Sequence, residues 1–260
     1  MDTAFFGDSS RPLLGVTHEP IGGALHDKAV LVCGPTMHEG IRAHRWGRQV
    51  CRQLSRRGFY TMRFDYSGEG DSYGSSGRPS VWVKDIETAA EELKDISGAR
   101  ELIIVGLRMG GTLALNASFG RTVVHIVLWD PIVSGQGYLE TCKGMHNEML
   151  KDSNRFSNPR LGHDDELLGF ALSKELSEEI SSLDLLSGTL SNVKEVSVFN
   201  SGSEPSRIAL TEHLAAQGIQ AKLHTIDDSP QWGALAELEN LIAVGEASQK
   251  IVRHIAEGSG

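Results

Sequence analysis

The chain has 260 residues, of which 40% are hydrophobic and 23% charged, a composition that is typical of soluble globular proteins and excludes collagen-like or disordered chains. Its formal net charge of −9 argues against nucleic acids and anionic membranes as partners, because both are bound through basic surfaces. The three cysteines form no CxxC pair, which favours a cytoplasmic protein over a disulfide framework.

Short apolar runs alternate with helical stretches along most of the chain. The pattern predicts, in chain order, a strand at 29–33, a helix at 41–57, a strand at 59–64, a helix at 80–97, a strand at 101–105, a helix at 112–118, strands at 123–129 and 194–199, a helix at 205–217, a strand at 221–226 and a helix at 235–257. Near-continuous apolar strands separated by helices are typical of a parallel sheet covered on both faces. Because the chain lacks a long apolar run and a basic leader, we expect neither a membrane span nor a signal peptide.

The stretch 134–190 interrupts this alternation. It is polar, lacks a clear strand and contains at least two helical pieces. Ligands of open α/β sheets bind at the carboxyl edge of the strands, so we expect this segment to form a lid over that edge. The predicted fold is therefore a doubly wound, mostly parallel α/β sheet whose core is built from 1–133 and 191–260, with 134–190 as a helical lid.

A tight turn between a buried strand and a helix is predicted at Gly106-Leu107-Arg108-Met109-Gly110. This context is that of the nucleophile elbow, G-x-S-x-G, but the central residue is Arg108. A guanidinium stays protonated and cannot attack a carbonyl, so an acyl-enzyme is not available at this position. The string at 70–74 also reads G-x-S-x-G, but it lies between a turn and a loop, and we expect its Ser72 to be structural.

Six segments together cover most of residues 4–190: FFGDSSRPLLGVTHEP, VLVCGPTMHEGIRAHR, RFDYSGEGDSYG, GLRMGGTLAL, VLWDPIVSGQGYLE and ELLGFALSKELSEEISSLDLL. In this combination they resemble the serine-aminopeptidase-like branch of the α/β-hydrolase superfamily. Within that branch, they resemble the hydrolase-like proteins found beside exosortase systems and in natural-product gene clusters. The resemblance implies the α/β-hydrolase fold, and an arginine at the elbow is familiar in that branch.

The other triad positions implied by the resemblance also depart from the hydrolase pattern. After the strand at 194–199 the nearest acid is Glu204, for which capping of the next helix is the alternative. Asp130 is a second acid position, and we hypothesise an ion pair between it and Arg108, since either charge buried alone would be costly. No histidine occurs where the base is expected, and Trp232 lies near that place. A Ser-His-Asp mechanism needs all three roles, so we exclude it.

Other polar groups remain at the predicted mouth. His38 and Glu39 follow the first strong strand, in the loop that supplies an oxyanion-hole N–H in this fold. His38 is an acid–base candidate because imidazole titrates near neutral pH, with an exposed loop imidazole as the alternative. Glu39 matches an acidic position of the branch and is expected to anchor Arg42 and His44.

The remaining candidates concern substrate and metal binding. The group of His146, His163, Asp164 and Asp165 has poor ligand spacing, so we predict no metal and no cofactor. Cys33 at a strand end is expected to be a small buried hydrophobic residue rather than a nucleophile. The residues expected to bind substrate are Thr36, Met37, Glu39, Met109, Tyr138 and Trp232.

Three functions remain open. The first is an enzyme that transfers an acyl or thioester-linked group, on a small molecule, a peptide or an acyl-carrier protein, through orientation and an oxyanion hole alone. The resemblance to natural-product proteins favours this one. The second is a non-hydrolytic epimerase or isomerase of a modified peptide, which needs a base and excluded water. The third is a catalytically inactive binding protein, because fold alone does not imply activity. A homodimer is also left open.

Overall fold

The computed structural model describes residues 1–120, 122–152, 165–188, 193–227, 230, 232–234 and 245–258. Their main feature is one eight-stranded sheet in the order β1-β2-β4-β3-β5-β6-β9-β10. β2 is antiparallel to β1 and β4, and the remaining pairs are parallel. The strands are β1 (Asp2–Phe6), β2 (Leu13–His18), β3 (Lys28–Cys33), β4 (Tyr60–Phe64), β5 (Glu101–Leu107), β6 (Val123–Trp129), β9 (Glu195–Ser201) and β10 (Gln220–Ile226).

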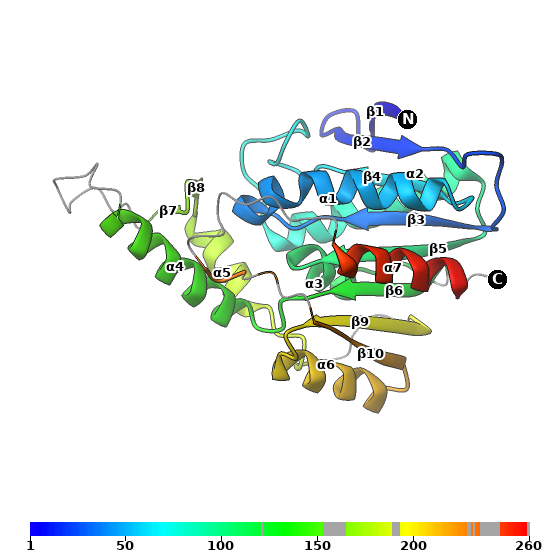
Figure 1. Ribbon diagram of the computed structural model, residues 1–260. Helices are drawn as coiled ribbons and strands as arrows, with labels where there is room; N and C mark the ends of the chain where they lie inside the picture. Colours follow the sequence, from blue (N-terminus) through cyan, green and yellow to red (C-terminus); the bar gives the residue numbers. More distant parts are fainter. Residues whose placement is uncertain are drawn as a thin grey trace.

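Helices cover both faces of this sheet (Figure 1). One face carries α1 (Met37–Ser55) and α7 (Glu246–Glu257), which contact each other. The other face carries α2 (Pro79–Ser97), α3 (Met109–Asn116) and α6 (Pro205–Ala216). The doubly wound α/β fold expected from the sequence is therefore confirmed.

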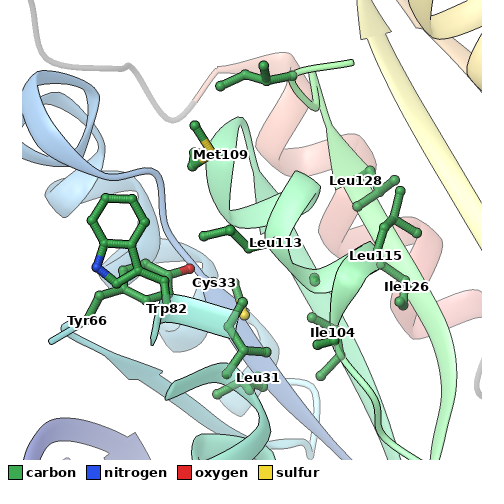
Figure 2. Packing of buried hydrophobic residues seen from close by; sticks show 14 of the residues in the cluster. Leu31, Cys33, Tyr66, Trp82, Ile104, Met109, Leu113, Leu115, Ile126 and Leu128 are labelled. Atoms are coloured by element: carbon green, nitrogen blue, oxygen red, sulfur yellow. The ribbon is translucent and has the colours of Figure 1, made fainter. Parts of the chain in front are cut away.

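The central strands bury side chains on both faces because they lie between two layers of helices. Leu31 and Ile104 belong to one apolar cluster, whereas their neighbours Val30 and Val105 belong to the other, as the alternation of side chains along a strand requires. Figure 2 shows part of the first cluster, where side chains of β3, β5 and β6 gather beside Leu113 of α3. This packing fixes the end of β5, at which the elbow lies.

Some element bounds differ from the sequence-based expectation. β1 and β2 were not predicted. β1 is an edge strand whose residues are mostly exposed, and β2, although mostly buried, is a short run that includes Gly15, Thr17 and His18. α1 and α3 begin earlier than expected because each tight turn leads directly into its helix. The helix predicted at 235–257 is described only as α7, and 235–244 lies outside the described residues.

The segment predicted as a lid lies to one side of the sheet (Figure 1). It contains α4 (Gly135–Asp152) and α5 (Lys174–Ser182), which contact each other, and an unexpected hairpin of β7 (Glu166–Leu167) and β8 (Phe170–Ala171). Its role as a lid stays a prediction. Among the described residues, no helix combines the length and apolar character needed to cross a membrane.

Candidate functional site

The turn between β5 and α3 has the strained backbone of a nucleophile elbow. Arg108 has φ 52° and ψ −121°, a conformation that costs a residue with a side chain about 1–3 kcal/mol. The flanking glycines are needed for close packing. A Cβ at Gly106 would collide with the backbone of Gly111, and a Cβ at Gly110 would collide with the carbonyl oxygen of Gly34. The elbow is thus intact around an arginine.

The guanidinium of Arg108 is held by Glu39, which lies in the first turn of α1. Nε and Nη2 of Arg108 each donate to Oε1 of Glu39 at 3.0 Å. Burial by itself lowers the pKa of Arg108, but the charge and hydrogen bonds of Glu39 outweigh it, so the pKa is raised overall. Nη1 reaches Asp130 only at its backbone carbonyl, at 3.2 Å. The hypothesised Arg108–Asp130 ion pair is therefore wrong, because Glu39 neutralises Arg108 instead.

The carboxylate of Asp130 is buried under the elbow and fully engaged. Its Oδ1 accepts the backbone N–H of Ser201 at 2.8 Å and forms an ion pair with Nη1 of Arg207 at 3.0 Å. Its Oδ2 accepts Nε1 of Trp232 at 2.8 Å. Arg207 was not among the predicted site residues, since an arginine in the first turn of a predicted helix has the pattern of a solvated residue.

Trp232 contacts both Asp130 and the elbow residue Arg108. Its indole N–H donates to Asp130, and its ring centroid lies 4.7 Å from Cζ of Arg108, within the range of a cation–π contact. An indole N–H is a donor only and cannot take a proton from an attacking group. Arg108, Trp232 and Asp130 thus lie in contact at the elbow, with an indole N–H rather than an imidazole bound to Asp130.

A cavity of about 480 Å³ opens beside this arrangement and is walled on one side by α4. Thr36, Met37, His38 and Met109 are buried in neighbouring turns but do not line it. Three of its wall residues, Glu39, Tyr138 and Arg207, keep a buried polar atom without a hydrogen-bond partner among the described residues, at Oε2, the phenolic oxygen and Nε respectively. The predicted residues that do line this elbow cavity are Glu39, Arg108, Tyr138, Glu204 and Trp232.

Comparison with known proteins agrees with this geometry. The family model described as serine aminopeptidase, S33, matches residues 27–182, more than half of the chain. The chain belongs to this family of α/β-hydrolases. A search of curated proteins finds no match.

Solved structures of other hydrolases are similar to this S33-family chain in fold. The esterase Est1E of Butyrivibrio proteoclasticus, with ferulic acid bound, is 15% identical with a TM-score of 0.67, over 98% of both chains. An esterase of Pyrococcus furiosus is 15% identical with a TM-score of 0.65, over 100% of this chain and 91% of that one. A serine hydrolase without a lid from Xanthomonas campestris is 16% identical with a TM-score of 0.60, over 98% and 94%.

His38 was expected in a loop at the mouth of the site, but it lies elsewhere. It lies in the first turn of α1 and is only 6% exposed, so the alternative of an exposed loop imidazole is wrong. Both ring nitrogens lack a partner among the described residues, and the ring stacks against Tyr138 at 6.4 Å between centroids. Burial lowers the pKa of His38 despite the opposite effect of Glu39, which favours a neutral imidazole.

Two further expectations for loop acids need correction. Glu39 is paired with Arg108 in the described structure rather than with Arg42 or His44, because its side chain points under the elbow. Glu204 precedes α6, but its side chain makes no capping hydrogen bond. The loop is held instead by Asn200, whose side chain bonds the N–H and the carbonyl of Glu204 at 3.1 and 3.0 Å.

Other potential nucleophiles and ligands have structural roles. Ser72 accepts the N–H of Leu14 at 2.8 Å and donates to the carbonyl of Asp65, as expected for a loop-fixing serine. Cys33 is fully buried and burial raises its thiol pKa, which does not suit a nucleophile.

One of the four residues considered as metal ligands, His146, has a structural role. His146 accepts the N–H of Leu168 at 3.1 Å through Nδ1, so that nitrogen is already engaged by the backbone. His163 and Asp164 lie outside the described residues. In the part of the chain that the structure describes, no three potential ligands come together.

Proposed function

We propose that this chain handles an acyl or thioester-linked substrate in the elbow cavity and transfers the acyl group without an acyl-enzyme. The observation that carries the proposal is Arg108 at the strained elbow, where it is held by Glu39 at the wall of the cavity. A hydrolase elbow retained around a permanent cation supports binding of an oxygen-rich group rather than nucleophilic attack.

Glu39 is the group that we assign to proton transfer. Its Oε1 is fixed by two hydrogen bonds from Arg108, whereas its Oε2 has no partner among the described residues. In the proposed reaction, Oε2 takes the proton of an acceptor hydroxyl, thiol or amine as that group attacks the thioester carbonyl. The C–S bond then breaks, and the proton passes from Glu39 to the departing thiolate, so that the enzyme is regenerated.

The carbonyl oxygen needs a donor during this step. The N–H that follows the elbow residue is an oxyanion donor in this fold, and here it belongs to Met109. The N–H of Met37 is less suited to this role, since it donates to Oε1 of Glu69 at 3.0 Å. Since Met109 does not line the elbow cavity whereas Arg108 does, we assign the oxyanion to the guanidinium of Arg108.

The test is incubation with N-acetylcysteamine thioesters and acceptor peptides, followed by mass spectrometry of the protein and the products. We expect acylated acceptor and no mass increase of the protein. Gly137 lines the elbow cavity from α4, so Gly137→Leu should abolish transfer. Gly144→Leu is the matched control, because Gly144 lies on the same helix with open space at its Cβ position. A covalent serine adduct with a fluorophosphonate would contradict the proposal.

A second candidate is ligand binding without chemistry. The specific observation in its favour is that Asp130 already accepts hydrogen bonds from Ser201 and Trp232 and is ion-paired with Arg207, so this acid cannot relay a proton. Binding of the thioester that is blocked by Gly137→Leu, without any product, would support this candidate. Deuterium uptake by a peptide ligand without acyl transfer would instead support the epimerase.

The proposed setting is the cytoplasm, with a small acyl compound, a peptide or an acyl-carrier protein as the partner. Support comes from the net charge of −9, which disfavours polyanionic partners, and from the three cysteines, which are all free and buried. The segment 134–190 is proposed to act as a lid, because residues of α4 wall the elbow cavity.

A further inference from the structure

A second cavity, of about 300 Å³, lies between the first half of α1 and the turn after β4. No residue lines both this cavity and the elbow cavity. It reaches the surface, since Ile41 on its wall is 66% exposed. Its volume is at the lower end for small-molecule sites, which are about 300–1,000 Å³, so an occupant would be small.

One wall of the second cavity carries unsatisfied donors. Trp46 is fully buried, and its Nε1 has no acceptor among the described residues. Arg63 is half-buried; its Nε likewise has no acceptor, and no ion pair involving it occurs in the described part of the chain. A buried N–H without an acceptor is unfavourable. Arg108 and Arg207, by contrast, each have a carboxylate.

Carboxylates line the same cavity near the turn after β4. They belong to Asp65, Glu69 and Asp71. Asp65 accepts the N–H of Asp71 at 3.2 Å, and Glu69 accepts the N–H of Met37 at 3.0 Å. None of these acids pairs with Arg63 in the described structure. The cavity therefore has a cationic, donor-rich part and an acidic part that do not neutralise each other directly.

We propose that the second cavity binds a small zwitterion of the α-amino acid type. The carboxylate would bind Arg63 and the indole N–H of Trp46, and the ammonium would bind the acidic part. Val32 and Phe64 on the wall supply apolar contact for a side chain. Binding here is independent of the acyl chemistry proposed for the elbow cavity.

The test uses L-leucine and follows the indole N–H signals of the four tryptophans by two-dimensional NMR. Trp46→Phe assigns the Trp46 signal. We expect L-leucine to shift that signal saturably. N-acetyl-L-leucine lacks the cation and L-leucinamide lacks the anion, so each should bind at least about tenfold more weakly, since losing one partner of a charge pair is costly.

Gly47 provides a matched pair of variants. A Cβ there meets only Cδ of Arg63, at 3.8 Å, so Gly47→Ala should keep binding, whereas Gly47→Leu should fill the cavity and abolish it. Both substitutions favour the helix. Arg63→Gln tests the charge without filling the cavity and should weaken binding at least about tenfold.

Three outcomes would overturn the proposal: no saturable shift up to the solubility of leucine, equal binding of all three probes, or unchanged binding by Gly47→Leu. Gly137→Leu blocks only the elbow cavity and should leave leucine binding unchanged. The two proposals therefore fail separately.

Discussion

The two ends of the neighbouring strands β6 and β9 accommodate buried polar groups in different ways. Beyond the carboxyl end of β6, Asp130 is paired with Arg207, and the nearby Arg108 with Glu39. Towards the amino ends, the hydroxyl of Ser197 lies 2.9 Å from a ring nitrogen of His125 and of His254. The buried groups at the carboxyl end are stabilised by ion pairs, whereas those at the amino end are stabilised by hydrogen bonds to imidazoles.

This difference predicts which end responds to pH. An Arg–carboxylate pair keeps its charges across the range in which imidazole titrates. Burial lowers the pKa of His125 to about 4 and also lowers those of His224 and His254. We call the region of Asp130 and Arg108 the charged end and the region of His125 and His254 the histidine end. Stability should therefore respond to substitution at the charged end and to low pH at the histidine end.

The largest expected effect is a gain of reactivity at the charged end. Arg108→Ser combined with Trp232→His places a nucleophile and a base beside Asp130, so we expect covalent labelling by a fluorophosphonate, read by mass spectrometry. Arg108→Ser alone lacks the base and should label far more slowly. Equal labelling of the single and double variants would show that Trp232 does not occupy the base position.

Removing one partner of a buried ion pair should cause the largest loss of stability. Glu39→Gln leaves Arg108 buried without its carboxylate, and we expect the free energy of unfolding to fall by about 3–5 kcal/mol, measured by denaturant titration. Adding Arg108→Met should recover part of this loss, because the charge is then absent. A drop below about 1 kcal/mol, typical of exposed pairs, would contradict the buried pairing.

The histidine end should make stability depend on pH. The pKa of His125 is about 4 in the folded state and 6.5 is the usual value. Between these two pH values the unfolded chain therefore binds more protons than the folded chain does. Stability should be fully present above pH 6.5 and fall progressively towards pH 4. The charged neighbours of His125, Glu195 and Lys222, form a partly exposed ion pair with each other at 2.8 Å.

The measurement for this prediction is the free energy of unfolding as a function of pH. His125→Phe should flatten the profile over that window. A profile that is the same with and without His125 would contradict the assignment.

The smallest effect comes from a matched pair of serines on β9. Ser197 binds the two histidines, and the hydroxyl of Ser201 accepts Nε1 of Trp129 at 2.9 Å. Each Ser→Ala change should cost about 1 kcal/mol in the free energy of unfolding. Only Ser197→Ala should alter its pH profile; the same change in Ser201→Ala would show that the two ends are coupled.

Much of the fold was predictable because its signals are local. Apolar runs such as 123–129 coincide with β6, since a strand buried on both faces has few polar positions. The edge strand β1 escaped prediction because its residues are mostly exposed. The elbow was also predictable, since Gly106 and Gly110 stand where the backbone leaves no room for a Cβ.

The sequence by itself determined that Arg108 stands at the centre of the elbow motif and that the segment around Trp232 contains no histidine, because both follow from residue types in short segments. Only the tertiary structure decided the partners of the buried charges. Glu39 and Arg108 are 69 positions apart, and Asp130 and Trp232 are 102 apart. Which acid meets which cation depends on strand order and on where α1 and α6 begin, and no local pattern encodes those distances.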